Sequence, residues 1–356
     1  MEIGIVGLPN VGKSTIFNAL TSGHAAASNY PFCTIEPNVG TVAVPDKRLA
    51  RLTGLFHPKK TIPAMVRFVD IAGLVKGAAQ GEGLGNQFLS HIREVDAILQ
   101  MVRLFKDPDV VHTMGTVDPR RDVEVIETEL ILADLSSIER QREKVEGKAK
   151  SGDKVSQAAL LVLEKVKAGL DAGKPARALG LDPRDIDPLF LLTAKPVLYV
   201  GNSDETPDPA HVKALEALAQ ERGAHCITLC GKLEAEISQL DAEERVVFLK
   251  EMGLETPGLE RVIVAAYRLL RQQSFFTAGE DEVRAWTVTQ GWKAPKAAGV
   301  IHTDFEAGFI KADIYSYKDI DAHEKESVLR EKGLIRSEGK EYMMQDGDVC
   351  FFKFSS

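Results

Sequence analysis

Residues 7–15 read Gly7-Leu8-Pro9-Asn10-Val11-Gly12-Lys13-Ser14-Thr15. The stretch matches G-x-x-x-x-G-K-[ST], the phosphate-binding loop. In this loop backbone N–H groups surround a polyphosphate, the lysine reaches the β- and γ-phosphates, and the serine hydroxyl is placed for Mg²⁺. Apolar residues precede it at 3–6 and follow it at helical spacing at 16–20. A strand, this loop and a helix N-terminus predict an α/β fold with an anion site at the start of the helix.

We therefore predict that six residues of the loop contact nucleotide, namely Asn10, Val11, Gly12, Lys13, Ser14 and Thr15. Lys13 is also counted among the catalytic residues. Ser14 is a predicted ligand of Mg²⁺.

The composition suits a globular protein of two or three domains. The chain has 356 residues, of which 44% are hydrophobic and 27% charged, and its formal net charge is −8. That balance gives no overall basic field for nucleic acid. The four cysteines form no C-x-x-C pair and no zinc spacing, so we expect reduced thiols in a cytoplasmic protein. We expect no signal peptide, because a strand begins at the N-terminus, and no membrane span.

A second nucleotide element follows about sixty residues later. An apolar strand at 65–69 ends in Asp70-Ile71-Ala72-Gly73. An aspartate at a strand end can hold Mg²⁺ through a water, and the glycine N–H can meet the γ-phosphate, so Asp70 is a predicted metal ligand and Gly73 a predicted nucleotide contact. The glycine-dense stretch after it predicts a switch segment; a long surface loop is the alternative.

A threonine between these two elements is the expected second protein ligand of Mg²⁺. Thr34 is our candidate because it lies in Tyr30-Pro31-Phe32-Cys33-Thr34-Ile35-Glu36-Pro37. Thr41 and Thr15 compete with it by residue type. Together with Asp70-Ile71-Ala72-Gly73-Leu74-Val75-Lys76-Gly77-Ala78 and the phosphate loop, this stretch resembles the Obg-like branch of the translation-factor P-loop NTPases.

The base-reading element departs from the guanine-specific pattern N-K-x-D. After an apolar strand at 196–200, the chain reads Asn202-Ser203-Asp204-Glu205. Glutamate in place of aspartate moves the carboxylate by about 1.5 Å, one carbon–carbon bond, and a bidentate contact to guanine tolerates little displacement. We therefore expect guanine preference to be lost, with adenine held by Asn202 and backbone groups near Ser203, and with Glu205 at the base. A register with Asp204 in place of Glu205 is the less favoured alternative.

This departure, within an otherwise Obg-like set, resembles the YchF subfamily, the Obg-like ATPases. The resemblance covers essentially the whole chain, including Asp107-Pro108-Asp109 and Phe275-Phe276-Thr277-Ala278-Gly279. The last base-side loop differs, because the family pattern Ser-Ala-Lys is here Cys230-Gly231-Lys232. Its backbone N–H groups survive, so Cys230 and Gly231 stay predicted nucleotide contacts.

The residue after Asp70-Ile71-Ala72-Gly73 is Leu74, which cannot orient water as the glutamine of many switch GTPases does. The resemblance points to a histidine in the loop after the strand at 97–102, and His112 lies there. A histidine could orient or deprotonate water near neutral pH; a surface histidine is the alternative. Asn10 in the phosphate loop is, by resemblance, a mark of K⁺-assisted members, and a loop-stabilising role is its alternative.

Two further modules follow from pattern. Residues 121–196 form an insertion with a turn at Ser151-Gly152-Asp153-Lys154. Helical spacing recurs before the turn at Ile126, Leu130, Ile131, Leu135 and Ile138, and a second amphipathic stretch follows it at Ala158, Leu161, Val162, Lys165 and Val166. This pattern predicts an antiparallel helical hairpin. Strands are expected at 283–288, 311–317 and 349–354. By resemblance, residues 275–356 form the family's TGS module, a small β-grasp sheet, and residues 1–274 form the OBG-type G domain that holds the hairpin.

The sequence thus predicts a cytoplasmic, Mg²⁺-dependent P-loop NTPase that prefers ATP, can accept GTP and hydrolyses slowly. The resemblance implies the ribosome as partner, its large subunit above all, with RNA contact through the hairpin and the TGS module and a role in translation or stress response. A GTP-dependent translation factor is the nearest alternative. A nucleotide-gated binding module with negligible catalysis stays open because of Leu74, and a small-molecule kinase is less favoured because both extra modules suit macromolecules.

Overall fold

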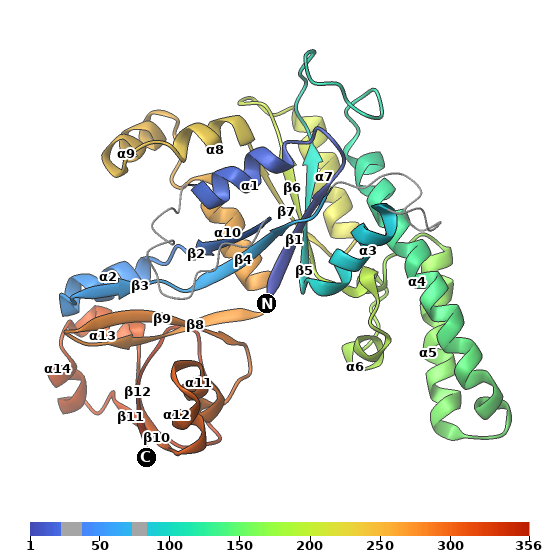
Figure 1. Ribbon diagram of the computed structural model, residues 1–356. Helices are drawn as coiled ribbons and strands as arrows, with labels where there is room; N and C mark the ends of the chain where they lie inside the picture. The colour runs from blue at the N-terminus through green and yellow to red at the C-terminus, as the bar shows by residue number, and fades with distance from the viewer. Residues whose placement is uncertain (23–37, 73–83, 356) are drawn as a thin grey trace. The chain divides into compact units, whose positions relative to one another are not determined.

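The computed structural model describes residues 1–22, 38–72 and 84–355, and Figure 1 shows its helices and strands. The contacts divide the chain into two compact units. The first comprises Met1–Gly40 and Arg67–Val262, and the second comprises Thr41–Val66 and Ile263–Ser356. In the part of the chain that is described, no helix has both the length and the apolar character needed to cross a membrane.

A six-stranded sheet forms the centre of the first unit. Its strands are β1 (Glu2–Gly7), β2 (Val39–Ala43), β4 (Met65–Asp70), β5 (Ala97–Arg103), β6 (Val197–Asn202) and β7 (His225–Leu229). They lie in the order β2-β4-β1-β5-β6-β7, and the pairs from β4 to β7 are parallel. Every residue of β5 and β6 is buried, because central parallel strands are covered on both faces.

Helices connect and cover these strands. They are α1 (Lys13–Ser22), α3 (Leu84–Glu94), α4 (Pro119–Lys150), α5 (Lys154–Asp171), α6 (Pro183–Ile186), α7 (Pro209–Glu221), α8 (Gly231–Ile237), α9 (Ala242–Glu251) and α10 (Gly258–Leu269), with short 3₁₀ turns at Ala176–Ala178, Asp187–Leu189 and Leu192–Ala194. Since the strands run parallel, their carboxyl ends meet at one edge of the sheet. The predicted phosphate and base loops both begin at that edge, after β1 and β6.

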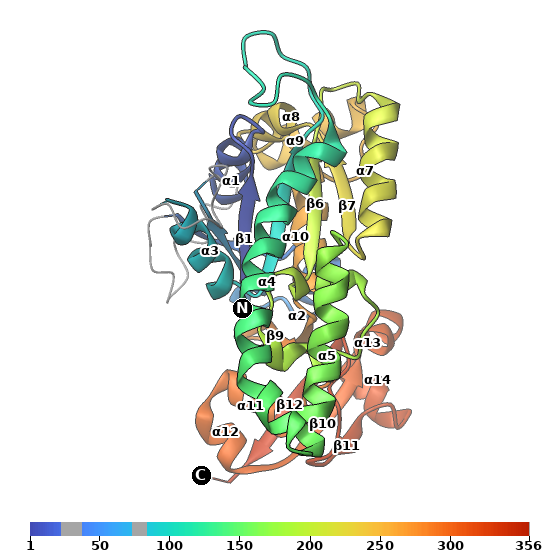
Figure 2. The same ribbon diagram turned by 90° about the vertical axis from the view of Figure 1, so that its right-hand side faces the viewer.

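The predicted antiparallel hairpin is present as α4 and α5, which lie side by side in both Figure 1 and Figure 2. Asp118 caps α4 by accepting a hydrogen bond from the Arg121 N–H at 3.1 Å, and Pro119 takes the first helical position, where its missing N–H costs nothing. The turn between the helices uses Gly152, with a φ of 94°, and Asp153, which caps α5.

The seam of the hairpin differs from the sequence expectation on one side. Ile131 and Ile138 of α4 are buried in it, as expected. On α5, however, Leu161 is 60% exposed and Leu163 is buried instead, together with Val166. Leu163, Val166 and Leu170 are three and four residues apart, so they lie on one face of α5. That face packs in the seam, and Leu161 lies outside it.

The second unit contains a mixed sheet. Its elements are α2 (Lys47–Phe56), β3 (Lys60–Ile62), β8 (Gln272–Ala278), β9 (Glu282–Thr289), α11 (Ala294–Ile301), α12 (Thr303–Ala307), β10 (Phe309–Ser316), α13 (Tyr317–His323), α14 (Glu326–Glu331), β11 (Arg336–Glu338) and β12 (Asp348–Phe354). The strand order is β11-β10-β12-β8-β9-β3. One core joins Phe275, Phe309 and Phe352 to the alanines of α11. The expected strands at 283–288, 311–317 and 349–354 correspond to β9, β10 and β12.

The contacts group residues 41–66 with this second unit, although the two ends of the segment lie in β2 and β4 of the first sheet. The sequence predicts the whole segment as part of the N-terminal domain. Strand β3 pairs in parallel with β9. Arg51 of α2 pairs with Asp321 at 2.8 Å and with Glu324 at 2.7 Å, and Arg48 pairs with Asp346 at 3.0 Å. The predicted boundary at 274 and 275 remains a prediction.

Candidate nucleotide-binding site

The phosphate loop joins β1 to α1 through two residues in the left-handed backbone region. Asn10 has a φ of 62° and Gly12 a φ of 88°. Position 12 also has no room for a side chain, because a Cβ atom there would lie 2.3 Å from Nδ2 of Asn202. The loop ends where α1 begins at Lys13, and the unpaired N–H groups of a helix N-terminus attract anions.

Asn202, at the end of β6, connects the phosphate loop to the loop before α8. Its Nδ2 donates to the Val11 carbonyl at 3.0 Å, and its Oδ1 accepts from the Gly231 N–H at 2.8 Å. The residue is 6% exposed, so losing either bond would leave a buried polar group unpaired. The sequence motif predicts that Asn202 holds the base. In the structure its amide joins the two loops, and only its second N–H and second lone pair remain for a ligand.

Lys13 and Asp70 meet between the phosphate loop and the end of β4. Lys13 Nζ donates to Asp70 Oδ1. The two side chains are partly buried, at 14% and 19% exposure. The phosphates of a nucleotide would compete with Asp70 for the lysine ammonium, because both offer it anionic oxygen atoms.

Two of the predicted Mg²⁺ ligands lie in the described chain. Ser14 is exposed in the first turn of α1, and Asp70 is the last residue of β4. A hydroxyl and a carboxylate are hard oxygen donors, and Mg²⁺ bound with substrate phosphates needs only one or two carboxylates from the protein. The residues therefore fit the ion. Thr34, Gly73 and Leu74 lie outside the described residues, as does the glycine-dense segment up to residue 83.

A cavity of about 1230 Å³ lies at this edge of the sheet. Four segments line it: the phosphate loop, residues 105–110, residues 202–206 and residues 230–239. Most predicted nucleotide contacts are on its wall, namely Asn10, Gly12, Lys13, Ser14, Thr15, Asn202, Ser203, Glu205, Cys230 and Gly231. The volume is sufficient for a nucleotide, since ligand cavities commonly measure about 300–1,000 Å³.

The base end of the cavity is built by residues 203–205. The Ser203 N–H donates to the Leu229 carbonyl at 2.8 Å, and Ser203 is buried. Asp204 Oδ2 accepts a hydrogen bond from the Lys106 N–H at 3.1 Å. Glu205 is exposed on the cavity wall. The neighbouring loop thus holds one oxygen of the Asp204 carboxylate, and Asp204 also lines the cavity. The register with Glu205 at the base stays a prediction.

Cys230 and Gly231 begin α8 on the far wall of the cavity. Cys230 is the N-cap residue, and its side chain makes no capping hydrogen bond. Gly231 cannot carry a side chain without a shift, because a Cβ atom there would lie 2.9 Å from Oδ1 of Asn202. Its small size therefore keeps the bond to Asn202 short.

His112 is held away from the cavity wall by two hydrogen bonds. Its Nδ1 accepts from the Met114 N–H at 3.0 Å, and its Nε2 lies 2.8 Å from Asp122 Oδ2. Since Nδ1 accepts from the Met114 N–H, Nε2 is the ring nitrogen that donates to the carboxylate. The His112 and Asp122 side chains are 6% and 2% exposed. Both ring nitrogens are therefore engaged, and His112 would have to leave Asp122 before it could act on a water.

Arg103 and Phe105, which no sequence motif predicts, join the phosphate loop to the loop after β5. Arg103, which is 2% exposed, donates to the carbonyls of Asn10 at 3.4 Å and Phe105 at 3.1 Å. Burial lowers the pKa of its guanidinium. The ring of Phe105, 4.1 Å from the guanidinium carbon, lines the cavity. The signal in the sequence is Arg103 itself, a charged residue at the end of a largely apolar strand, because a charged residue is rarely buried without a partner.

Two family models match the chain. One, described as a 50S ribosome-binding GTPase, matches residues 2–132. The other, the C-terminal YchF-GTPase model, described as a protein of unknown function, matches residues 272–355.

The chain is also 50% identical to "Ribosome-binding ATPase YchF" of Bacillus subtilis, over 100% of this chain and 99% of that protein. The chain belongs to the YchF family. The protein of the same name from Haemophilus influenzae is 49% identical over 99% of each chain.

A solved structure of the YchF family supports the fold over both units. The Schizosaccharomyces pombe YchF GTPase is 38% identical, covers 99% of this chain and 97% of its own, and superposes with a TM-score of 0.89. A GTP-binding protein from Pyrococcus horikoshii, with a TM-score of 0.62 and 19% identity, shares the fold. The P-loop NTPase fold with a C-terminal domain is thereby confirmed.

Proposed function

We propose that the chain is a slow, Mg²⁺-dependent ATPase that binds ATP in preference to GTP and uses its nucleotide state to control binding to the ribosome in the cytoplasm. Relatives 50% and 49% identical to it are named ribosome-binding ATPases. The fold supports a P-loop nucleotide hydrolase, and the substrate preference is argued from the base end of the cavity.

One observation carries the preference for ATP. A guanine-specific site needs a carboxylate in one fixed position to accept two hydrogen bonds. Here Asp204 and Glu205 both line the cavity. The Lys106 N–H holds Oδ2 of Asp204, so the carboxylate that we expect at the base is that of Glu205. Glu205 has a longer side chain than aspartate, so its carboxylate is poorly placed to accept the two hydrogen bonds from guanine. A site that cannot pair the buried polar groups of one base discriminates strongly against it.

The chain's own residues supply binding and orientation. Gly12 and the α1 N-terminus would hold the phosphates, and Lys13 would exchange Asp70 for phosphate oxygens. Ser14 and Asp70, with Thr34, would hold Mg²⁺, which when bound neutralises charge on the phosphates. His112 is the residue that would orient or deprotonate the attacking water, and it must leave Asp122 before it can take the proton. That extra step is our reason for expecting slow turnover.

Asn10 supports a further proposal, assistance by K⁺. Its Nδ2 donates to the Val111 carbonyl at 3.1 Å, which leaves the carboxamide oxygen as the atom that could bind a cation. A monovalent cation there would stabilise the charge that develops on the phosphates. Faster turnover in K⁺ than in Na⁺ buffer is expected, and equal rates would exclude the role.

Ribosome contact is proposed through the hairpin of α4 and α5 and through the C-terminal unit, with the large subunit as the expected partner and RNA as the expected contact. The family model described as a 50S ribosome-binding GTPase covers residues 2–132 and supports the large subunit. The TGS assignment of the C-terminal unit belongs to the same proposal.

Turnover of purified protein tests the enzymatic part. Phosphate release from ATP with Mg²⁺ is expected in the wild type and is expected to disappear in Lys13→Ala, which excludes a contaminating ATPase. A rate equal to that of the variant would leave a nucleotide-gated binding module, the alternative that the engaged His112 favours. Cosedimentation with purified ribosomes, with and without ATP, tests the partner separately.

A further inference from the structure

Helix α9 exposes apolar side chains to solvent. Val246 is 67% exposed and Val247 57%, and just past the helix Met252 is 44% and Leu254 36% exposed. None of the α9 side chains that the structure describes is buried. The following helix, α10, is different, because it buries Ile263 completely.

The helix is nevertheless well defined at both ends. Asp241 accepts from the N–H groups of Glu243 and Glu244 at 2.9 Å each, and the Glu244 side chain accepts from the Asp241 N–H, which completes a capping box. At the other end, Gly253 has a φ of 66° and the Leu254 N–H donates to the Leu249 carbonyl at 2.8 Å, as in a Schellman motif.

This combination indicates a missing packing partner. Most of the stability of a short helix in a protein comes from packing its apolar face, not from its ends. Caps specify α9 locally, and its Phe248 and Leu249 are half-buried, yet Val246 and Val247 pack against little of the chain. The helix therefore has an apolar face available to another molecule.

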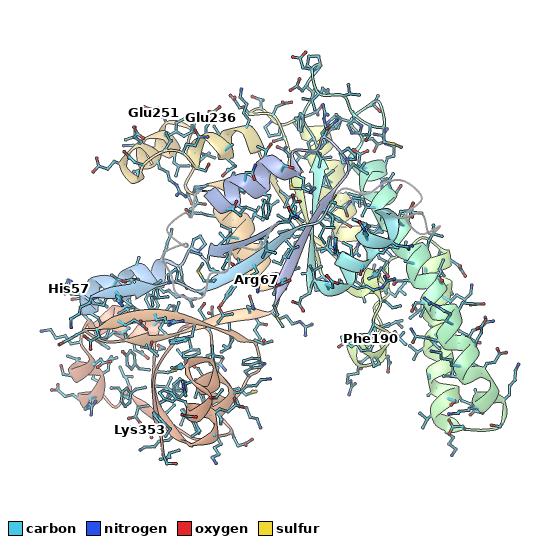
Figure 3. All side chains as sticks on the ribbon, viewed as in Figure 1. His57, Arg67, Phe190, Glu236, Glu251 and Lys353 are labelled. Carbon is cyan, nitrogen blue, oxygen red and sulfur yellow. The ribbon has the colours of Figure 1, made fainter. Side chains whose placement is uncertain are left out.

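Acidic side chains accompany these apolar ones. The exposed acids of α8, α9 and the flanking residues are Glu236, Asp241, Glu243, Glu244, Glu251 and Glu255. Figure 3 shows Glu236 on α8 and Glu251 at the end of α9. Of the basic residues of α8 and α9, Lys232 and Lys250 are exposed and Arg245 pairs with Glu260. We call the four apolar side chains and these six acids the α9 surface.

The charge of the α9 surface selects among the molecules that could cover it. RNA and anionic lipid headgroups would bring like charges together. A second copy of the chain, related by a two-fold axis at this surface, would place acid against acid. A protein segment with lysines or arginines beside an apolar stripe would bury the valines and match the charge.

We propose that the α9 surface is a docking site for a cationic amphipathic segment of a partner protein. The apolar stripe of the segment packs on Val246 and Val247, and its basic side chains meet Glu251 and Glu255. The proposal is independent of which nucleotide the cavity takes. It places a protein partner next to that cavity, since α8 lines the cavity and leads directly into α9.

The test measures binding of the full chain to a labelled synthetic helix that has leucines along one face and lysines elsewhere, by fluorescence anisotropy. A control peptide of the same composition has its leucines spread around the helix. We expect the amphipathic peptide to bind at least about tenfold more tightly, a difference of about 1.4 kcal/mol. Equal binding of the two peptides would overturn the proposal.

Double variants locate the binding. Val246→Ser with Val247→Ser, and separately Glu251→Lys with Glu255→Lys, are each expected to weaken binding about tenfold. Thermal unfolding should be unchanged, because the substituted side chains are exposed. Glu143→Lys with Glu164→Lys makes the same charge change at exposed residues of the hairpin and should weaken binding less than about twofold.

An equal loss in the hairpin control would mean that the peptide follows only the net charge of the chain, and would contradict the proposal. Binding of a single-stranded RNA oligonucleotide that the two serine substitutions abolish would contradict it as well, because the surface would then serve nucleic acid.

Discussion

Asn202 connects two loops on the wall of the nucleotide cavity, the phosphate loop and the loop before α8. Its amide bonds to Val11 in the phosphate loop and to Gly231 at the start of α8. A pattern match placed this asparagine at the base, because that is where such a residue stands in the sequence motif. The contact with Val11 joins residues 191 positions apart, and local sequence carries no signal for a pair so distant.

Replacing this amide should weaken both loops. Asn202→Ala leaves the Val11 carbonyl and the Gly231 N–H without their partner, so we expect the free energy of unfolding to fall by about 1–3 kcal/mol. ATP should bind more weakly in the same variant. Urea unfolding and calorimetry measure the two effects. A variant of wild-type stability would show that water replaces both bonds at no cost.

His112 gives a prediction about rate. His112→Ala should lower ATP turnover more than about tenfold, within the range that a general base contributes, while nucleotide affinity stays the same. Steady-state turnover and a binding titration separate the two. His225→Ala, at an exposed position of the edge strand β7, is the matched control and should turn over normally. Normal turnover in His112→Ala would remove this residue from the mechanism.

The rate at which Cys230 is modified, compared with that of Cys226, tests whether nucleotide covers the cavity wall. Burial raises the pKa of the Cys226 thiol to about 11, so at pH 8 only about one molecule in a thousand carries the reactive thiolate. Reactivity at Cys226 should rise only as the pH approaches that pKa. Cys230 is partly exposed on the cavity wall. We expect a maleimide to modify Cys230 faster than Cys226 at pH 8, and Mg-ATP to protect Cys230.

Peptide mapping by mass spectrometry assigns each modified cysteine separately. Modification of Cys230 at the same rate with and without saturating Mg-ATP would mean that nucleotide does not cover this wall of the cavity.

At the scale of elements, α4 links the site to the hairpin. Asp122, in its first turn, bonds to His112, and the helix continues to Lys150 near the hairpin turn. Further along α4, Glu127 pairs with Arg177 and with Arg222, the latter at 3.2 Å. The Glu127 side chain is 4% exposed. This buried cluster fixes the base of the hairpin to the sheet, since Arg177 also donates to the Tyr199 hydroxyl at 3.1 Å.

Removing the charge at the centre of this cluster should be costly. Glu127→Gln removes the carboxylate that pairs with the buried Arg177 and leaves Arg222 only the more exposed Glu124 and Glu221. We therefore expect the free energy of unfolding to fall by about 3–5 kcal/mol. Glu124→Gln, at a 42% exposed partner of Arg222 and Arg120, should cost at most about 1 kcal/mol. Thermal or denaturant unfolding compares the two variants. Equal losses would contradict the assignment of Glu127 to a buried cluster.

Helices and strands were largely predictable where apolar residues recur at a regular spacing or form a clear run. The hairpin and its turn followed from helical spacing and from Ser151-Gly152-Asp153-Lys154, and the strands beside the phosphate loop followed from short apolar runs. The register of α5 was not predictable in the same way. Leu161 and Leu163 are both apolar, and which of them faces α4 depends on how the two helices pack.

At the scale of the whole chain, sequence order and spatial grouping differ in one place. Residues 41–66 lie between two nucleotide motifs in sequence, yet they pack with the C-terminal unit through β3 and through Arg48 and Arg51. Charged residues on an amphipathic helix look the same whether their partners are near or distant in sequence. Composition and motif therefore located the nucleotide loops, and the grouping of this segment required the fold.

The central claim is that the chain prefers adenine to guanine nucleotide, and it rests on Glu205 and on the engaged carboxylate of Asp204. The most direct test is a calorimetric titration of nucleotide-free protein with ATP and with GTP, both in the presence of Mg²⁺. We predict clearly tighter binding of ATP. Tighter binding of GTP would contradict the account of Glu205 and would favour a GTP-dependent translation factor instead.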